Sequence, residues 1–225
     1  MADITLSYST IQYCLQESNS HNWLNKQMGA EVPDQIYFTE GKICHRIIQD
    51  HVAGIKEHPA LSHIPLKFEK VELGDKDESM EFKFSINKMY KKLMGVEAPL
   101  SREYHFHGYR DGLKADFSAM LEIKSSSTLW SIGKFMKAMQ RKCYGLDDRL
   151  THAYLITCPR NPKLWNKIKP KYYKVPYTKQ DQIDAIKWIV DGAMILDKGE
   201  FSGGLDENGN CCLPRCNYGF NCQFR

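Results

Sequence analysis

A glutamate and a lysine lie in the middle of a largely apolar stretch, residues 117–125, which the sequence predicts to be a β-strand. Because side chains alternate along a strand, Glu122 and Lys124 project from one face while Leu121 and Ile123 project from the other. Charged groups in the centre of a sheet are costly unless they are paired with each other or bound to a metal. The strand therefore needs a fold that gives it one apolar face and one charged face.

Helices and strands alternate around this segment. An extended stretch over 104–111 and the turn residues 112–116 precede it, so a β-hairpin is the simplest expectation. The segment 67–95 has a mixed pattern and predicts no definite element. Apolar spacing and capping residues predict the remaining elements: helices over 9–28, 39–54, 128–144 and 178–195, with Ser9, Thr39 and Thr178 as N-caps, and a buried strand over 152–158. This order predicts an α/β fold with a mixed sheet flanked by helices.

The composition is that of an ordinary globular protein. The 225 residues are 42% hydrophobic and 26% charged with a net charge of +4, which argues against wholesale disorder and predicts one domain over 1–225 with its core at about 36–160. No apolar run approaches the roughly 18–20 residues needed to cross a bilayer. The first residues lack the basic and apolar parts of a secretory signal. We therefore expect a cytoplasmic protein without a membrane partner.

Two carboxylates come together if the hairpin forms. Asp111 then meets Glu122 across the two strands and provides a second oxygen ligand for Mg²⁺ or Mn²⁺. Such an ion polarises a phosphoryl oxygen and lowers the pKa of a bound water, which Lys124 can orient. Asp116 is an alternative partner for Glu122, although its setting is that of a turn residue. An isolated Glu-x-Lys pair is, by itself, most often a surface ion pair.

Several short motifs occur in one order along the chain. They are Gly41-x-x-x-His45, Gly108-x-x-Asp111, Glu122-x-Lys124 and Gln140-x-x-x-Tyr144, with Glu103 upstream of the second. In this order they resemble the RecB-like branch of the PD-(D/E)XK nuclease superfamily, over roughly residues 9–222. The resemblance implies a restriction-endonuclease-like fold and a metal-dependent deoxyribonuclease.

The same resemblance assigns roles to individual residues. The implied metal ligands are His45, Asp111, Glu122 and the main-chain carbonyl of Ile123, and Asp111, Glu122 and Lys124 are the implied catalytic residues. Gln140 and Tyr144 would support the site and contact DNA. Without the resemblance, His45 is more simply a surface or partly buried histidine, and Gln140 and Tyr144 are ordinary residues four apart on one helical face.

Four of the eight cysteines lie in the last fifteen residues, a pattern that in a reducing compartment indicates zinc or iron–sulfur ligation. The CRISPR-associated iron–sulfur RecB-like exonucleases, which the chain resembles, hold a [4Fe–4S] cluster with one cysteine before the nuclease core and three after it. That resemblance implies the ligands Cys14, Cys212, Cys216 and Cys222, with Cys211 as a substitute, and a staple that joins the helix at 9–28 to the tail at 205–225. The chain departs from the family in having Leu15 where proline is usual and three residues between Cys212 and Cys216. Zinc bound by the tail cysteines is the alternative.

A basic segment over 160–174 contains no acidic residue and includes Lys167, Lys169 and Lys171. Cations of this kind neutralise phosphates, and the interspersed Trp165, Tyr172 and Tyr173 can stack on unpaired bases. Because no recognition domain is evident, the resemblance favours an exonuclease acting on single-stranded DNA or duplex ends over sequence-specific cleavage. It implies a role in recombination, repair or DNA-end processing in a phage or prokaryotic host. A homo-oligomer or a recombination or replication protein is a possible partner. The alternative is a catalytically inactive nucleic-acid-binding or assembly subunit that keeps the fold and the metal staple.

Overall fold

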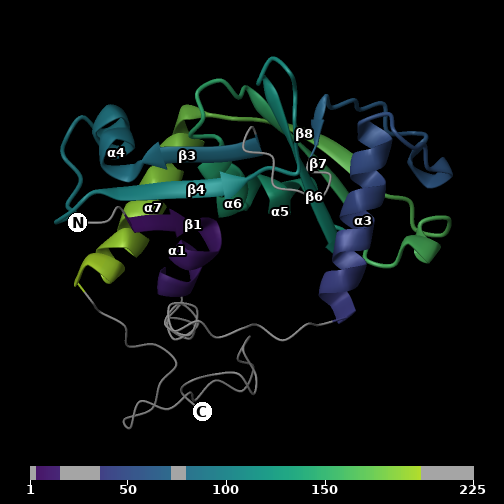
Figure 1. The fold of residues 1–225 in the computed structure, drawn as a ribbon, viewed down its shortest axis with the longest axis horizontal. Coiled ribbons are helices and arrows are strands. Elements are labelled where there is room, and N and C mark those ends of the chain that lie inside the picture. Colours follow the sequence, from purple (N-terminus) through teal and green to yellow (C-terminus); the bar gives the residue numbers. More distant parts are fainter. Residues whose placement is uncertain (1–3, 16–35, 72–79, 199–225) are drawn as a thin grey trace, which may run out of the picture. The chain divides into compact units, whose positions relative to one another are not determined.

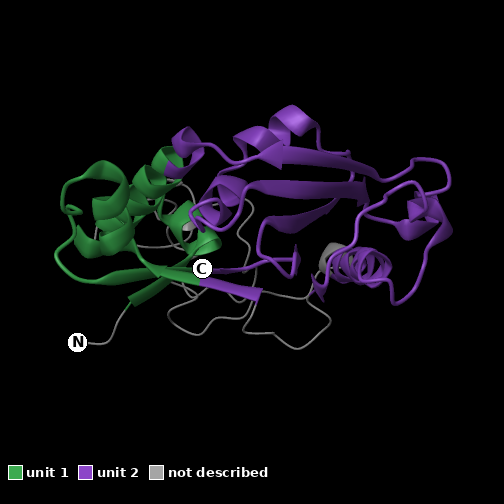
Figure 2. Ribbon diagram, turned by 90° about the horizontal axis from the view of Figure 1, so that it is seen from above, with its two compact units in different colours: residues 1–34, 83–107, 183–225 green, residues 35–82, 108–182 purple. Residues whose placement is uncertain are grey.

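The computed structural model of the chain describes residues 4–15, 36–71 and 80–198. The chain divides into two compact units, one of residues 1–34, 83–107 and 183–225 and the other of residues 35–82 and 108–182 (Figure 2). The single domain expected from the length stays a prediction. None of the described helices is long and apolar enough to cross a membrane.

The first unit is built around a three-stranded sheet with the order β1-β4-β3. Its strands are β1 (Ile4–Ser7), β4 (Tyr104–Tyr109) and β3 (Glu81–Ser85), and β1 runs parallel to β4. Its helices are α1 (Tyr8–Leu15), α4 (Ile86–Met94) and, from Ile183 onward, α7 (Lys179–Lys198). The expected helix over 9–28 is thus present as α1, and its continuation over 16–28 lies outside the described residues.

The second unit contains a five-stranded mixed sheet with the order β2-β5-β6-β7-β8 (Figure 1). The strands are β2 (Lys70–Val71), β5 (Gly112–Leu113), β6 (Ala119–Ser126), β7 (His152–Pro159) and β8 (Lys171–Pro176). Only β6 and β7 are parallel; the other neighbours are antiparallel. Helix α3 (Ile36–Val52) covers one face, and α5 (Ile132–Lys137) and α6 (Met139–Tyr144) lie on the other, with short 3₁₀ turns η1 (Pro59–Leu61) and η3 (Pro162–Leu164) in the connections. The expected mixed α/β architecture is confirmed.

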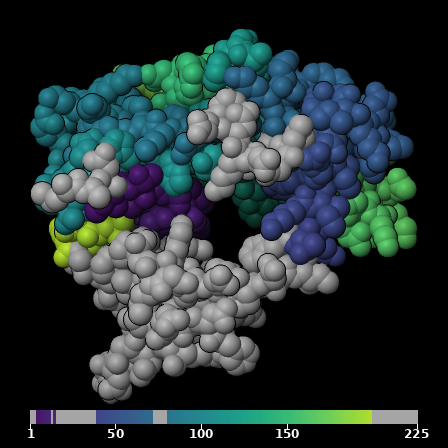
Figure 3. Space-filling view, in the orientation of Figure 1, coloured from purple at the N-terminus to yellow at the C-terminus, as the bar shows by residue number. Residues whose placement is uncertain are grey.

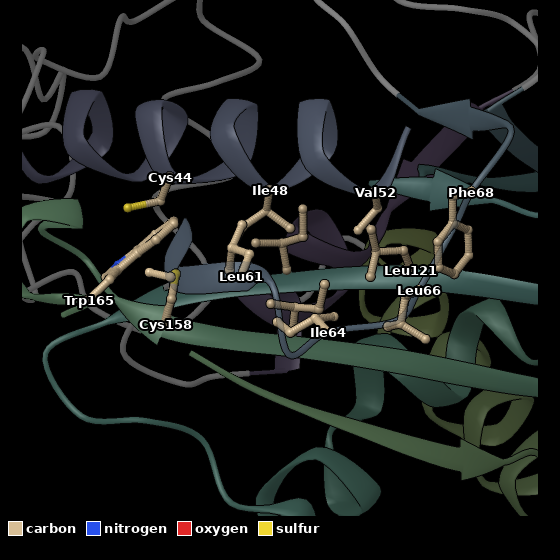
Figure 4. Packing of buried hydrophobic residues seen from close by; sticks show 13 residues of the cluster. Cys44, Ile48, Val52, Leu61, Ile64, Leu66, Phe68, Leu121, Cys158 and Trp165 are labelled. Carbon is tan, nitrogen blue, oxygen red and sulfur yellow. The ribbon is translucent and has the colours of Figure 1, made fainter. Parts of the chain in front are cut away.

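Alternation along β6 separates the two faces of this sheet. Leu121 and Ile123 are buried in one apolar cluster with Cys44, Ile48 and Val52 of α3 (Figure 4). Burying each such side chain contributes about 1.5–3 kcal/mol, so this contact fixes α3 on the sheet. Glu122 and Lys124 consequently face α6, as the period-two pattern predicts.

The expected hairpin between 104–111 and 117–125 is wrong in its first strand. Strand β4 lies between β1 and β3 in the other sheet, so both of its hydrogen-bonding edges are occupied. The strand that pairs with β6 is β5, in which Gly112 lies opposite Leu121, so residues expected to turn are extended instead. The turn lies later, where the Lys114 N–H donates to the Ala119 carbonyl.

Other boundaries also differ from expectation. Helix α3 begins at Ile36, so Thr39 is not its N-cap, and it ends at Val52, near the predicted stop. The helix expected over 128–144 breaks into α5 and α6 because Ala138 adopts an extended ψ of 119°. Thr178 caps α7 as expected, since its hydroxyl accepts from the Asp181 N–H. Strand β8 begins within the basic segment, for which the sequence predicts no strand, and β2, β3 and α4 lie in the segment left unassigned.

Candidate active site

Asp111 lies immediately before β5 and is held by both α3 and β6. Its Oδ2 accepts a hydrogen bond from the Ile123 N–H at 2.6 Å, and its Oδ1 lies 3.4 Å from Nδ1 of His45. The Gln49 side chain donates to the main-chain carbonyl of Asp111 at 3.0 Å. The register that places Gly112 opposite Leu121 also brings Asp111 to the position facing Glu122. The pairing of Asp111 with β6 expected from the sequence is therefore present, although through a different hairpin.

The contact between Asp111 and His45 stabilises opposite charges. Burial alone raises the pKa of the Asp111 carboxyl, but the hydrogen bond and charge of His45 and the Ile123 N–H outweigh burial and lower that pKa overall. Burial likewise opposes protonation of His45, yet Asp111 raises the pKa of the imidazole above its ordinary value. The pair therefore favours a carboxylate beside an imidazolium.

Glu122 and Lys124 form a second charged pair on the α6 face of β6. Lys124 Nζ lies 2.5 Å from Glu122 Oε1 and also donates to Gln140 Oε1 at 2.8 Å. Glu122 is only 4% exposed, and burial raises the pKa of its carboxyl despite the neighbouring ammonium. Lys124 is therefore fixed between a buried carboxylate and an amide.

Gln140 and Tyr144 support these groups from α6. The Tyr144 hydroxyl donates to the Tyr109 carbonyl at 2.7 Å and also contacts the Gln140 side chain. A Cβ at Gly108 would lie 2.8 Å from the Tyr144 ring, so glycine is needed where β4 passes this side chain. Tyr144 is 5% exposed, so it supports the site and has little surface to offer DNA.

The donor set has the chemistry of a site for a hard divalent cation. Asp111 and Glu122 supply carboxylate oxygens, and the Ile123 carbonyl points to the same strand edge as its N–H, toward Asp111. In the described residues, however, no group of three or more His, Cys, Asp or Glu side chains is already arranged to hold a metal. An ion here would have to displace Lys124 from Glu122 and His45 from Asp111. The oxygen ligands are therefore of the type that such an ion prefers. The two contacts that compete with the ion, Glu122 with Lys124 and Asp111 with His45, lie within the chain.

Two other acidic residues considered from the sequence lie elsewhere. Asp116 accepts hydrogen bonds from the N–H and the hydroxyl of Ser118, as a turn residue does. Glu103 is exposed and accepts from the Ser85 hydroxyl within the first unit. Asp111 is thus the aspartate that reaches β6.

Arg110 is a supporting residue that the sequence did not reveal. It is fully buried, its guanidinium lies 2.7 Å from Asp147 Oδ2, and it lies 4.9 Å from the Phe82 ring centre. An arginine next to Asp111 in an expected hairpin looks like a surface residue. Its acidic partner is 37 positions away, and no local pattern announces the pairing.

The basic segment exposes its lysines to solvent, whereas its tryptophan is buried. Trp165 is fully buried and donates from Nε1 to the Pro159 carbonyl at 2.8 Å, so the expectation that it stacks on bases is wrong. Lys167, Lys169 and Lys171 are exposed, and Tyr172 is 38% exposed. The Cys44 thiol donates to the Arg160 carbonyl at 2.8 Å, which connects the start of the basic segment to α3. The basic segment and α3 lie side by side on the surface (Figure 3).

Of the proposed cluster ligands, only Cys14 lies within the described residues. It is buried on α1, and burial raises the pKa of its thiol to about 12. Cys211, Cys212, Cys216 and Cys222 lie outside the described residues. The iron–sulfur staple therefore stays a prediction.

No protein-family profile and no curated protein matches this sequence. Among solved structures, the crystal structure of SSO0001 is similar, with a TM-score of 0.52 at 13% sequence identity. The similarity covers 87% of this chain and 78% of that one. At this level of identity the likeness concerns the fold alone.

Proposed function

We propose that the chain is a Mg²⁺- or Mn²⁺-dependent deoxyribonuclease of the RecB-like PD-(D/E)XK class. Its substrate would be single-stranded DNA or duplex ends, cleaved as an exonuclease during recombination, repair or DNA-end processing. The observation that supports this most is the convergence of two charged pairs on Ile123. Asp111, paired with His45, binds the Ile123 N–H, and Glu122 and Lys124, paired with each other, precede and follow Ile123 in β6.

The protein groups divide the work of phosphodiester hydrolysis. A bound Mg²⁺ or Mn²⁺ would supply Lewis-acid polarisation of the phosphoryl oxygen and a more acidic water. Lys124 offers an ammonium to the charge that develops on the phosphate, and Gln140 holds its orientation. Glu122, buried on β6, and Asp111 are the carboxylates that would hold such an ion. The Ile123 N–H keeps Asp111 in place, and His45, which lies beside Asp111, would be a further ligand of the ion.

A second candidate is a catalytically inactive nucleic-acid-binding or assembly subunit. The observation favouring it is that Lys124 and His45 already neutralise both carboxylates. Such pairs need no divalent cation for their stability. DNA would then bind through the exposed lysines of the basic segment alone.

A time course with end-labelled single-stranded and duplex DNA separates the two candidates. The parent should cleave with Mn²⁺ or Mg²⁺ and not with chelator, and Lys124→Ala should abolish cleavage. Lys114→Ala is the matched control, because Lys114 pairs with Glu69 away from this cluster. Binding without cleavage by the parent would favour the inactive subunit, and full activity of Lys124→Ala would reject the site.

The cysteine staple would have a structural role in this proposal. A [4Fe–4S] cluster on Cys14, Cys212, Cys216 and Cys222 would join the two ends of the chain, with zinc as the alternative. Assembly into a homo-oligomer, or with a recombination or replication protein, is part of the same proposal.

A further inference from the structure

Trp130 is anchored beside the candidate catalytic lysine. It lies in the connection between β6 and α5, and its main-chain N–H donates to Thr157 Oγ1 at 2.9 Å. Thr157 is fully buried and lies opposite Lys124 in the parallel register of β6 and β7. A strand-to-strand spacing is about 4.8 Å, so the Trp130 backbone is held within a short, fixed distance of Lys124.

The indole ring lies among cations. Lys124 Nζ is 5.5 Å from the ring centre, and Lys134 Nζ is 4.3 Å from it. Both are within the range of a cation–π interaction. The side chain is only partly buried, in contrast to Trp165, which lies fully in the core. Trp130 is thus partly exposed next to the charged pair of Glu122 and Lys124.

Helix α5, which follows Trp130 in the chain, also exposes apolar side chains. Ile132 is 44% exposed and Met136 is 48% exposed, and both follow Trp130 within two helical turns. Lys134 and Lys137 lie on the same short helix and are exposed. This part of the chain combines apolar and aromatic groups with ammonium groups, and residues 125–146 include no acidic residue. Such a surface suits a ligand that has flat apolar faces and a negatively charged backbone.

We propose that Trp130 is the stacking platform for an unpaired nucleobase next to the phosphate that the site acts on. This inference rests on the proposed nuclease function and specifies its substrate: a single strand or a frayed end rather than an intact duplex. The physical reason is that a base within a duplex has both faces covered by its neighbours, whereas an unpaired base can place one face on the indole. Lys134 and Lys137 would then lie near the adjoining phosphates.

The test compares binding of three DNA probes in the presence of chelator, so that no cleavage occurs. The probes are fluorescently labelled oligothymidylate, the same backbone with abasic sites, and a blunt duplex of equal length. Trp130→Leu should weaken oligothymidylate binding by on the order of 10-fold and leave the abasic and duplex probes unchanged. Trp130→Phe, which keeps a ring, should lose less. Equal weakening for all three probes, or no change for any, would overturn the proposal.

Cleavage assays with Mn²⁺ distinguish this proposal from the nuclease function itself. Trp130→Leu should raise KM for single strands more than it lowers kcat, while duplex substrates are affected less. If the parent cleaves and the variant loses the same factor on both substrates, the nuclease function stands and the stacking role fails. If no protein cleaves but Trp130→Leu selectively weakens oligothymidylate binding, the stacking role stands and hydrolysis fails. Ile43→Ser is the control, because Ile43 is an exposed apolar side chain, at 49%, that lies on α3 rather than beside Trp130.

Discussion

The carboxylate of Asp111 completes the edge of β6 by accepting the hydrogen bond of the Ile123 N–H at 2.6 Å. Strand β5 pairs with β6 only at two positions, where Gly112 faces Leu121 and Leu113 faces Met120. At Ile123, past these two positions, the Asp111 side chain takes the place of a strand backbone as the hydrogen-bond acceptor. Asp111 therefore has two tasks that substitution can separate, since it satisfies a backbone donor and carries the charge beside His45.

Two substitutions at Asp111 should separate these tasks. Asp111→Asn keeps an oxygen that can accept from the Ile123 N–H, so we expect a small loss of stability and complete loss of metal-dependent cleavage. Asp111→Ala leaves the N–H without that partner and should cost a further ~1–3 kcal/mol in the free energy of unfolding. Urea unfolding and the cleavage assay measure the two effects.

Asp116→Asn is the control for both measurements, because Asp116 lies in the turn of the same hairpin. It should retain cleavage. Equal stability of Asp111→Asn and Asp111→Ala would show that the hydrogen bond to Ile123 contributes nothing measurable.

Gly108 is constrained by the ring of Tyr144 rather than by its own backbone. A methyl group there would lie 2.8 Å from Tyr144 Cε1, so Gly108→Ala must displace the ring and its hydrogen bond to the Tyr109 carbonyl. We expect a loss of roughly 1–3 kcal/mol in stability, as for an overpacked core, and reduced cleavage. Gly133→Ala in α5 is the control, since nothing lies within 4 Å of the added methyl. It should leave stability unchanged or raise it by up to about 1 kcal/mol. An unaffected Gly108→Ala would disprove this explanation of the glycine.

Local patterns predicted the parts of the site that depend on local geometry. The alternation of Glu122 and Lys124 with two apolar residues placed both charges on one face, because the period of a strand is independent of what surrounds it. The four-residue spacing of Gln140 and Tyr144 placed both on one side of α6 in the same way.

Features that depend on distant partners could not be predicted in this way. The pairing of β4 depends on β1, a strand about 100 residues earlier, and no turn signal between 104 and 125 reveals it. Trp165 and Arg110 are fully buried although their neighbours in sequence are basic or polar. Their burial depends on the Pro159 carbonyl and on Asp147, contacts that form only in the folded chain.

The ion pair of Arg110 with Asp147 predicts a pH-dependent stability. Burial raises the pKa of Asp147, but Arg149 and Arg110 outweigh it, so the pKa lies below its ordinary value of 3.8. The stabilisation is therefore complete above about pH 4 and is lost as the pH falls through the lowered pKa. Asp147→Asn leaves the buried Arg110 without its counter-charge and should cost about 3–5 kcal/mol at neutral pH.

Urea unfolding at a series of pH values checks this expectation. The difference between the parent and Asp147→Asn should shrink below about pH 4, because protonation removes the same charge from the parent. The neighbouring exposed Asp148, replaced by asparagine, should change stability by no more than about 0.5 kcal/mol. A difference that stays constant down to the acid transition would contradict the assigned role of the charge.

The exposed lysines of the basic segment predict a salt dependence. Each contact with a phosphate of single-stranded DNA adds about 0.7 to the slope of log K against log salt. Replacing Lys167, Lys169 and Lys171 together with glutamine should therefore reduce the slope by about 2, as measured by titrating labelled DNA at several salt concentrations. Lys56→Gln, at an exposed position after α3, should leave the slope unchanged. An unaltered slope in the triple variant would remove this segment from the DNA-binding surface.

The cysteine staple can be tested at Cys14 by comparison with another buried thiol. Cys14 is 5% exposed and Cys143 is 1% exposed, and burial raises the pKa of both, so packing alone does not distinguish them. A ligand thiol must release its proton when it binds the metal, whereas a thiol in the core keeps its proton. Anaerobically purified parent and Cys143→Ser should therefore contain about four irons per chain and an iron–sulfur chromophore, and Cys14→Ser should lose both. Zinc retained by Cys14→Ser would instead place the metal on the tail cysteines alone. Iron-free, colourless parent protein would reject the cluster while leaving the charged pairs around Ile123 as they are.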